Sequence, residues 1–252
     1  MELGLLPYGP ACELQRRLVQ ARKANAVPDV LFFCEHPHVI TLGRNGQREH
    51  LRVSRSLLEQ MNVEFHPTDR GGDITYHGPG QIVGYPILDL ARHRRDVRWY
   101  VEQLEEVMIR TTAGHGVAAK RLADGHGIWI DTEAGEEKLA ALGVHLSRWV
   151  TSHGFAYNVS ADLRYFDLIV PCGLVGKGVT SLERVLGRAV SGDEIRASLA
   201  WHFGEVFERT MIPTSRQELE QALSSYELSA AAHAAAYECA PQEVTAAKGS
   251  QA

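Results

Sequence analysis

The sequence has few cysteines and no long apolar run. Its cysteines, at positions 12, 34, 172 and 239, lie far apart and form no C-x-x-C pair. This spacing suits neither a structural zinc site nor a disulfide framework, and it favours a reducing compartment. No segment approaches the length that crosses a bilayer, and the first residues lack the basic region and apolar stretch of a signal peptide. We therefore expect a soluble, cytoplasmic protein without a membrane partner.

An excess of basic charge is also missing. With 26 basic and 31 acidic side chains the net charge is −5, so no overall field attracts nucleic acid. Contact with an acidic partner must come from a local patch. Two groups of arginines could form this patch: Arg44 and Arg48, and then Arg92, Arg94, Arg95 and Arg98. The alternative for the second group is an ordinary solvated loop.

Fingerprints of nucleotide binding are absent as well. Neither G-x-x-x-x-G-K-[ST] nor G-x-G-x-x-G occurs, so spacing gives no support for a phosphate cradle. The stretch Cys34-Glu-His36-Pro-His38 offers several metal ligands, but alternation along a strand and the kink at Pro37 scatter them. We expect no metal site.

Apolar spacing predicts helices and strands that alternate within one domain of the α+β class, a mixed sheet flanked by helices. Asp96 reads as a helix N-cap, and Thr180-x-x-Glu183 reads as a capping box before a short helix closed by Gly187. The three strands from 127 to 160 suggest an antiparallel meander with turns near Gly135 and Arg148. The other expected elements are helices after Pro10, at 97–114 and at 195–207, strands at 30–36 and 38–43 joined by a tight turn, and a buried strand at 81–90.

The C-terminal residues differ in composition from the rest. Beyond Tyr226 the chain is mostly alanine and small polar residues, with too few large apolar groups to join a core. We expect a folded domain over 1–225, followed over 226–252 by a helical extension that frays into a partly disordered tail.

Residues 70–81, RGGDITYHGPGQ, hold four glycines and a proline between expected strands. Glycine permits positive φ and close approach of another molecule to the main chain, so this segment can wrap a ligand. The alternative is a pair of tight turns. Four polar side chains favour the ligand: Arg70, Thr75, Tyr76 and His77.

Cys172 stands between Pro171 and Gly173 after an apolar strand, where a thiol is accessible. The alternative is that Cys172 has only a structural role. A thiol with an ordinary pKa near 8.5 is only slightly ionised at neutral pH, so a reactive cysteine needs a cation beside it. Lys138 is a possible cation, although by itself it reads as a solvated strand-end lysine. Cys12 and Cys34 fall on a helix and a strand, where cysteine is usually a small hydrophobe.

Several motifs together resemble one family, the lipoyl(octanoyl) transferases. The stretch at 70–85, R-G-G-D-I-T-Y-H-G-P-G-Q-I-V-G-Y, matches the family signature. It is accompanied in order by E-H-P-x-x-I-T-L-G-R (35–44), K-L-A-A-L-G-V (138–144), H-G-F-A-x-N-V (153–159) and P-C-G-L…G-V-T-S-L (171–182). The resemblance runs from about residue 3 to 210.

The resemblance implies a biotin/lipoate ligase-like fold and an acyltransferase of lipoate biosynthesis that uses no cofactor. Cys172 would carry the acyl group as a thioester intermediate and Lys138 would lower its pKa. The donor would be octanoyl-acyl carrier protein, and the acceptors would be lysines on lipoyl domains of 2-oxoacid dehydrogenases and on glycine cleavage H protein. The substrate-contacting positions would be Arg70, Gly71, Gly72, Asp73, Ile74, Thr75, Tyr76, His77, Ala141, Leu142, Gly143, His153, Gly154, Phe155 and Ala156.

Asp73 and Tyr157 need separate comment, and two alternative functions stay open. Asp73 receives no special role of its own, and Tyr157 stands where the family usually has leucine, which can alter strand packing or narrow an acyl tunnel. One alternative is an ATP-dependent lipoate or biotin ligase, which needs no nucleophilic cysteine. The other is an acyl-binding module that catalyses nothing.

Overall fold

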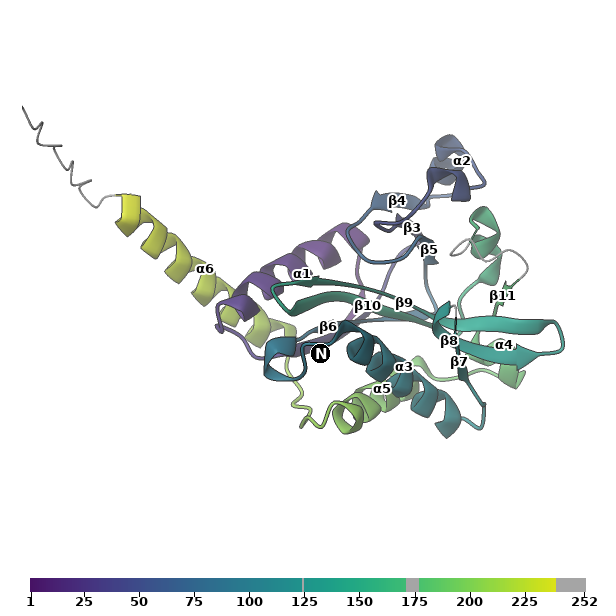
Figure 1. Cartoon of the computed structure of the whole chain (residues 1–252). Coiled ribbons are helices and arrows are strands. Elements are labelled where there is room, and N and C mark those ends of the chain that lie inside the picture. Colours follow the sequence, from purple (N-terminus) through teal and green to yellow (C-terminus); the bar gives the residue numbers. More distant parts are fainter. Residues whose placement is uncertain (124, 171–176, 239–252) are drawn as a thin grey trace, which may run out of the picture.

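The computed structural model describes residues 1–123, 125–170 and 177–238. Within them, a mixed sheet of eight strands is joined to a smaller sheet of three (Figure 1). The large sheet contains β1 (Glu2–Leu5), β2 (Val30–Glu35), β6 (Gln81–Ile87), β7 (Lys120–Leu122), β8 (Gly125–Thr132), β9 (Gly135–Ser147), β10 (Val150–Asn158) and β11 (Gly178–Val179). The small sheet contains β3 (Val39–Leu42), β4 (Glu64–Pro67) and β5 (Ile74–His77).

The helices are distributed along the whole chain. They are α1 (Tyr8–Lys23), α2 (Arg55–Gln60), α3 (Val97–Gly114), α4 (Leu182–Leu186), α5 (Gly192–Val206) and α6 (Arg216–Glu238), with 3₁₀ turns η1 (Arg48–His50), η2 (Leu90–Arg92) and η3 (Leu163–Leu168). None of these described helices is long and apolar enough to cross a membrane.

The large sheet has the order β1-β2-β6-β10-β9-β8-β7, and β11 pairs with β9. The β1–β2 and β11–β9 pairs are parallel and the others antiparallel, so the sheet is mixed and the α+β class is confirmed. The predicted meander is β8-β9-β10. Its turns are made possible by positive φ at Gly135, and at Arg148 and Trp149.

The two strands expected at 30–36 and 38–43 are present as β2 and β3, but they belong to different sheets. β2 and β3 follow each other closely, but β2 pairs with β1 and β6 in the large sheet, whereas β3 pairs with β4 and β5 in the small one. The turn between them contains Pro37, which has no N–H to donate to a strand ladder. The chain therefore leaves one sheet and enters the other at this point.

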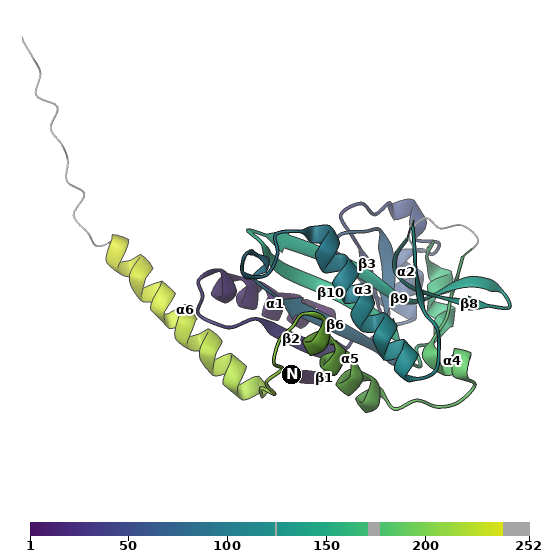
Figure 2. The ribbon, with the colours of Figure 1, turned by 60° about the horizontal axis from the view of Figure 1, so that its bottom comes forward.

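Helices cover both faces of the large sheet. The apolar side of α1, with Ala11, Leu14 and Leu18, packs on β6 and β10, while α3 and α5 cover the opposite face (Figures 1 and 2). The Asp96 carboxylate accepts a hydrogen bond from the Trp99 N–H at 3.0 Å, which confirms it as the N-cap of α3. The predicted amphipathic helices thus build the two halves of the core.

The expected capping box at 180–183 is wrong by one residue. The Ser181 hydroxyl, not that of Thr180, accepts from the Arg184 N–H. The Thr180 N–H donates to the Lys138 carbonyl at 3.0 Å, so the contact of β11 with β9 continues one residue past Val179 and the helix starts after it. Gly187 closes α4 in the left-handed conformation, as predicted.

Helix α6 begins on the core and projects away from the body of the protein (Figure 1). Leu219 and Leu223 are buried against the α1 side, and Arg17 forms an ion pair with Glu220 at 2.8 Å. The expected helical extension is confirmed as far as Glu238, and residues 239–252 lie outside the described chain. The domain division at 225 stays a prediction, since α6 runs across it.

Candidate active site

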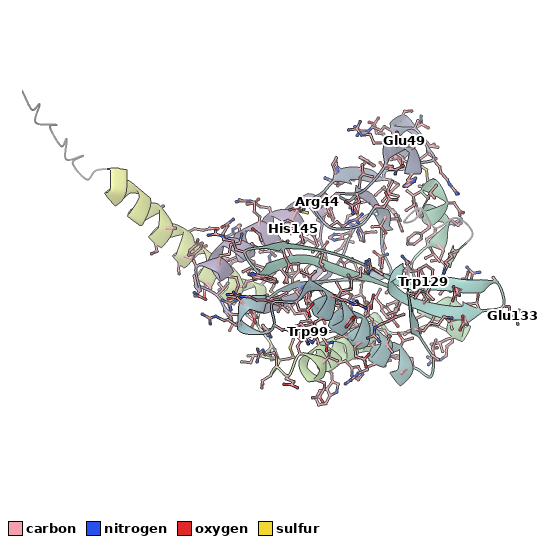
Figure 3. The ribbon with its side chains drawn as sticks, in the orientation of Figure 1. Arg44, Glu49, Trp99, Trp129, Glu133 and His145 are labelled. Atoms are coloured by element: carbon pink, nitrogen blue, oxygen red, sulfur yellow. The ribbon has the colours of Figure 1, made fainter. Side chains whose placement is uncertain are left out.

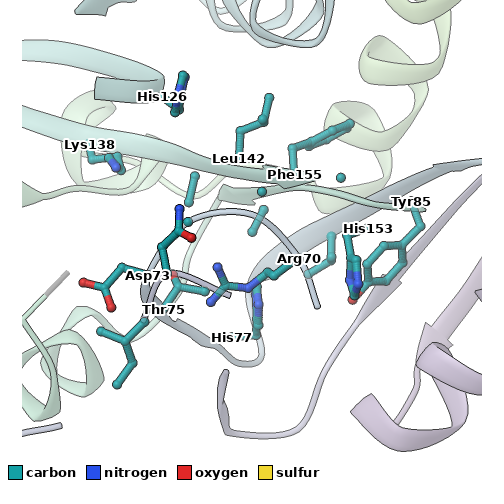
Figure 4. Close-up of a pocket in the computed structure, with 18 of the residues that line it drawn as sticks. Arg70, Asp73, Thr75, His77, Tyr85, His126, Lys138, Leu142, His153 and Phe155 are labelled. Carbon is teal, nitrogen blue, oxygen red and sulfur yellow. The ribbon is translucent and has the colours of Figure 1, made fainter. Parts of the chain in front are cut away.

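A cavity of about 280 Å³ lies between the 70–81 segment, which we call the glycine loop, and strands β9 and β10. This volume is near the lower end of the usual range for small-ligand sites, about 300–1,000 Å³. Among the positions expected to contact substrate, the following line it: Arg70, Gly72, Asp73, Ile74, Thr75, His77, Ala141, Leu142, Gly143, His153, Gly154, Phe155 and Ala156, together with Lys138 (Figure 4).

The glycine loop crosses β9 at backbone contact distance. The Gly71 N–H donates to the Val144 carbonyl at 2.9 Å, and Gly72 has a positive φ of 84°. A Cβ on Gly143 would lie 2.8 Å from the Gly71 oxygen, closer than real Cβ contacts allow. The glycines therefore bring two backbones together to form one wall of the cavity, and Gly71 contributes to this wall without lining the cavity itself.

Arg70 anchors the loop to the small sheet. Its guanidinium donates to the Thr41 carbonyl at 2.8 Å, to the Thr41 hydroxyl at 2.9 Å and to the Gly71 carbonyl at 3.0 Å. The residue is buried although it carries a charge. Three oxygen acceptors offset the cost of removing that charge from water, so the loop has one stable geometry.

Alternation along β5 separates its side chains. Thr75 and His77 line the cavity, whereas Tyr76 lies in the core of the small sheet, where its ring stacks on Tyr165 and its hydroxyl bonds His38 Nδ1 at 2.8 Å. Successive residues of a strand point to opposite faces. Tyr76 therefore does not line the cavity, although the sequence expectation included it.

Asp73 has more contacts than the sequence suggested. It lines the cavity, its Oδ1 accepts from the Gln47 N–H at 3.2 Å, and its Oδ2 bonds His50 Nδ1. The His50 carbonyl in turn accepts from the Val170 N–H at 2.8 Å. Asp73 thus connects the glycine loop to the chain just before position 171.

Lys138 lies inside β9, not at a solvated strand end. The strand starts at Gly135, so Lys138 has β8 on one side and β11 on the other and is only 7% exposed. Its ammonium lies 4.7 Å from the centre of the Trp129 ring, a cation–π contact. The expectation of a solvated lysine is wrong because β11 adds a strand that the sequence did not indicate.

The opposite end of the cavity is aromatic and polar. Tyr8, His77, Tyr85 and His153 line it, and Figure 4 shows His153 and Tyr85 far along the cavity from Lys138. Burial lowers the pKa of His77 to about 3, so this imidazole is neutral and its Nδ1–H donates to Gln81 at 2.7 Å. This end therefore carries no free charge from His77.

Some lining residues were missed by the sequence analysis. Val83 and Tyr85 face the cavity from β6, and their alternation with Ile82 and Gly84 was a usable signal. The remaining four come from the start of α1, the loop after β3 and the start of β8, where no pattern points to the site: Tyr8, Asn45, Gly125 and His126.

Cys12 and Cys34 are the cysteines that lie within the described residues. Cys172, the expected acyl carrier, lies outside the described residues, as does Cys239. Burial raises the pKa of Cys12 to about 11 and raises that of Cys34 further, so both thiols stay protonated at neutral pH. Neither is suited to nucleophilic attack.

The histidines near Cys34 are used in hydrogen bonds. His36 Nδ1–H donates to the Leu6 carbonyl at 2.6 Å and its Nε2 accepts from the Tyr85 hydroxyl at 2.7 Å. His38 Nδ1 bonds the hydroxyl of Tyr76, which belongs to β5 of the small sheet. Within the described part of the chain, no group of three or more potential metal ligands comes together.

The arginines do not form one patch. Arg44 bonds His145 at 3.0 Å beside the cavity, next to the lining residue Asn45. Figure 3 shows Arg44 and His145 on one side of the large sheet and Trp99, at the start of α3, on the other. Three arginines near that helix form ion pairs with acidic neighbours: Arg92, Arg94 and Arg98.

Tyr157 lies away from the cavity. It is fully buried under α3, where its hydroxyl bonds the Thr112 hydroxyl at 2.8 Å, and it does not line the cavity. The departure from leucine is accommodated by a polar partner on a helix. Tyr157 therefore does not narrow the space available to a ligand.

Comparison with known proteins places this geometry in a family. Residues 7–204 match the model described as the lipoyl protein ligase A/B catalytic domain. The octanoyltransferase of Solibacter usitatus is 51% identical over 84% of this chain and 94% of its own length, and that of Acidobacterium capsulatum is 47% identical over 82% and 89%.

Solved structures agree on the fold. The bipartite lipoate protein ligase of Thermoplasma acidophilum superposes with a TM-score of 0.67 at 15% identity, covering 89% of each chain. A lipoate-protein ligase A bound with ATP gives 0.64 at 16% identity, covering 89% of this chain and 94% of that one. The lipoate-ligase-like fold expected from the sequence is thus confirmed, and the chain belongs to the lipoyl protein ligase A/B catalytic-domain family, among its octanoyltransferases.

Proposed function

We propose that this enzyme transfers an octanoyl group from octanoyl-acyl carrier protein to the ε-amine of a lysine on a lipoyl domain, through a thioester on Cys172. The acceptors would be the lipoyl domains of 2-oxoacid dehydrogenases and the H protein of glycine cleavage. The observation that carries the proposal is a cavity with a buried lysine, Lys138, at one end, beside the two chain segments that flank residue 172.

Those flanking segments are both fixed next to the site. Val170 bonds His50, which is paired with the lining residue Asp73, and Val179 pairs with Lys138. In the sequence, position 172 comes two residues after Val170 and seven before Val179. This supports a position of the thiol near the Lys138 end.

The remaining cysteines support the choice of thiol. Cys12 and Cys34 have raised pKa values, as described above, and a protonated thiol is a poor nucleophile. A thiol beside the Lys138 ammonium would have a lowered pKa, since an adjacent positive charge favours the thiolate.

The reaction then proceeds in two balanced steps. Cys172 thiolate attacks the thioester carbonyl, the bond to the carrier sulfur breaks, and Lys138 ammonium gives its proton to the departing thiolate. The acceptor amine attacks the new thioester, the Cys172 sulfur leaves, and neutral Lys138 takes the proton of the amine. His153 lies at the far end of the cavity from Lys138 (Figure 4), so Lys138 is the base assigned to this step.

The cavity supplies binding energy for the acyl tail. At about 0.8 kcal/mol per buried methylene, an enclosed octanoyl chain gains about 5 kcal/mol. Converting a thioester into an amide is downhill, so no nucleotide is needed. Arg44, exposed at the cavity edge, is the arginine best placed to contact an acidic carrier.

The test is transfer from octanoyl-acyl carrier protein to an apo lipoyl domain without ATP or Mg²⁺. Product and a single octanoyl adduct on the enzyme, detected by mass spectrometry, are expected. Cys172→Ser should lose both, whereas Cys34→Ala, a matched change at a buried thiol, should keep both. Transfer only with ATP would indicate a ligase, and binding without an adduct would indicate a non-catalytic module.

A further inference from the structure

Trp129 is the cross-strand partner of Lys138, and a bulge between β8 and β9 makes it so. Ile128 pairs with Ala140, but the next pair is Trp129 with Lys138, which leaves Leu139 as the extra residue. Leu139 and Ala140 both join the core cluster that α3 covers. Directly opposed residues share one face of a sheet, so the bulge places the indole ring on the face where Lys138 lies.

The face of this ring contacts the Lys138 ammonium. The nitrogen lies 4.7 Å from the ring centre, and the tryptophan is only 1% exposed. The Lys177 ammonium lies 5.1 Å from the same centre and is held by Glu136 at 2.8 Å. Lys138 lines the cavity and Trp129 does not, so the ring can influence the cavity only through its neighbours.

The indole N–H of Trp129 is buried and makes no hydrogen bond to the residues that the structure describes. A buried donor without an acceptor is costly, and phenylalanine or leucine would fill apolar space without that cost. Among aromatic side chains, however, the indole offers the strongest face for a cation. Use of this face by an ammonium group explains why an indole stands here.

An aromatic face holds a cation in a way that suits acyl transfer. The ring attracts an ammonium group through its quadrupole, and it has no net charge and no proton acceptor. A carboxylate in the same place would offset the positive charge that a nearby thiolate needs. The ring therefore fixes the ammonium group and leaves its charge available to the reacting sulfur.

We propose that Trp129 is a positioning residue for acyl transfer, because its ring holds the Lys138 ammonium at the end of the cavity without neutralising it. The inference rests on the proposed function and adds the group that places its lysine. Trp129 contacts no substrate atom in this role, and its effect on the reaction passes through Lys138.

The sharpest test weakens the ring face without changing the shape of the side chain. Tryptophan carrying one, two or three ring fluorines is introduced at position 129 alone, since fluorine withdraws electron density from the face. The kcat of octanoyl transfer should fall stepwise, by about tenfold in total, while KM stays within about twofold of the wild-type value. A kcat that does not change across the series would overturn the inference.

A pair of ordinary substitutions gives a second measurement. Trp129→Phe keeps an aromatic face, whereas Trp129→Leu removes it, and both leave the side chain smaller. The phenylalanine variant should retain a kcat about fivefold or more above that of the leucine variant, at similar melting temperatures. Equal kcat values in the two variants would show that volume matters and the ring face does not.

The matched control is the same fluorine series at Trp99 in α3. This indole also has a cation over its face, Arg94 at 5.9 Å, but it is packed against α5 and does not line the cavity. Its kcat should stay within about twofold of the wild-type value throughout the series. A stepwise loss equal to that at position 129 would overturn the inference.

Chemical labelling separates this inference from the proposed reaction. Acetic anhydride labelling of Lys138, read by mass spectrometry with Lys23 of α1 as the internal reference, reports the contact without turnover. Labelling should become faster as fluorines are added to Trp129, because the lysine is held less firmly. If the wild type transfers no octanoyl group, the proposed function is wrong, yet faster labelling would still support the contact. Unchanged labelling would refute it.

Discussion

Gly143→Ala tests whether the glycine loop and β9 must meet at backbone distance. The added Cβ would lie 2.8 Å from the Gly71 oxygen and 3.3 Å from Arg70 Cδ. An ordinary contact needs about 3.4 Å, so the loop must retreat by roughly half an ångström. The Gly71 to Val144 hydrogen bond, now 2.9 Å, would be stretched to the limit of a useful bond.

The magnitude follows from two effects. Weakening one backbone hydrogen bond costs about 1 kcal/mol, and overpacking costs about 1–3 kcal/mol. We expect unfolding free energy to fall by about 2–4 kcal/mol and octanoyl transfer to fall at least tenfold, mainly through KM, because the displaced loop lines the cavity. Urea unfolding and initial rates over a range of donor concentrations measure both.

Gly114→Ala is the control for this substitution. A Cβ there meets nothing within 4 Å, and the residue lies in α3 without a positive φ, so stability should stay equal or rise by up to about 1 kcal/mol and activity should be unchanged. Wild-type stability and KM in Gly143→Ala would refute the argument that close approach is why glycine occurs here.

Three further predictions concern the core, the acidic range and the C-terminal helix. Burial lowers the pKa of His77 from 6.5 to about 3, so the unfolded chain binds a proton that the folded one does not, and stability is full above pH 6.5 and declines below it. His77→Gln should reduce this decline between pH 7 and 5 in urea unfolding, and an identical decline would contradict the assignment. Tyr157→Phe removes the hydrogen bond to Thr112 and should lower the free energy of unfolding by about 1 kcal/mol. The ratio of octanoyl to decanoyl transfer rates should not change, and an altered ratio would mean that Tyr157 reaches the acyl chain. Ending the chain after Tyr226 keeps Leu219 and Leu223, so the melting temperature and the transfer rate should stay near those of the wild type. Ending it after Ser215 removes both leucines and should lower the melting temperature, because the apolar side of α1 becomes exposed. Equal melting temperatures of the two truncated chains would disprove the packing role of α6.

Local patterns predicted most elements because local physics controls them. Asp96 caps α3 through a hydrogen bond three residues away, and the apolar spacing of Ala11, Leu14 and Leu18 reflects one face of a helix. The same reasoning failed at Thr180, where a hydrogen bond to the Lys138 carbonyl, more than forty positions away, holds the residue against β9. Long-range pairing overrides a capping motif because it supplies the stronger set of backbone partners.

The candidate site was only partly predictable for a related reason. The motif at 70–85 contained Arg70, Thr75 and His77 as lining residues, but it could not show that Tyr76 points away from the cavity into the core of the small sheet. Tyr8 and His126 arrive from distant parts of the chain with no signal of their own. Proximity between remote segments depends on strand order, which no local pattern records.

The sequence by itself determined the class of fold, the amphipathic helices, the three-strand meander and the family. These depend on spacing along the chain and on motifs that stand unbroken in it. Only the tertiary structure decided that Lys138 is buried beside β11, that Asp73 connects to His50, and that Tyr76 points away from the cavity. Each of these depends on which strands become neighbours, and that choice is made by packing of the whole core rather than by any one segment.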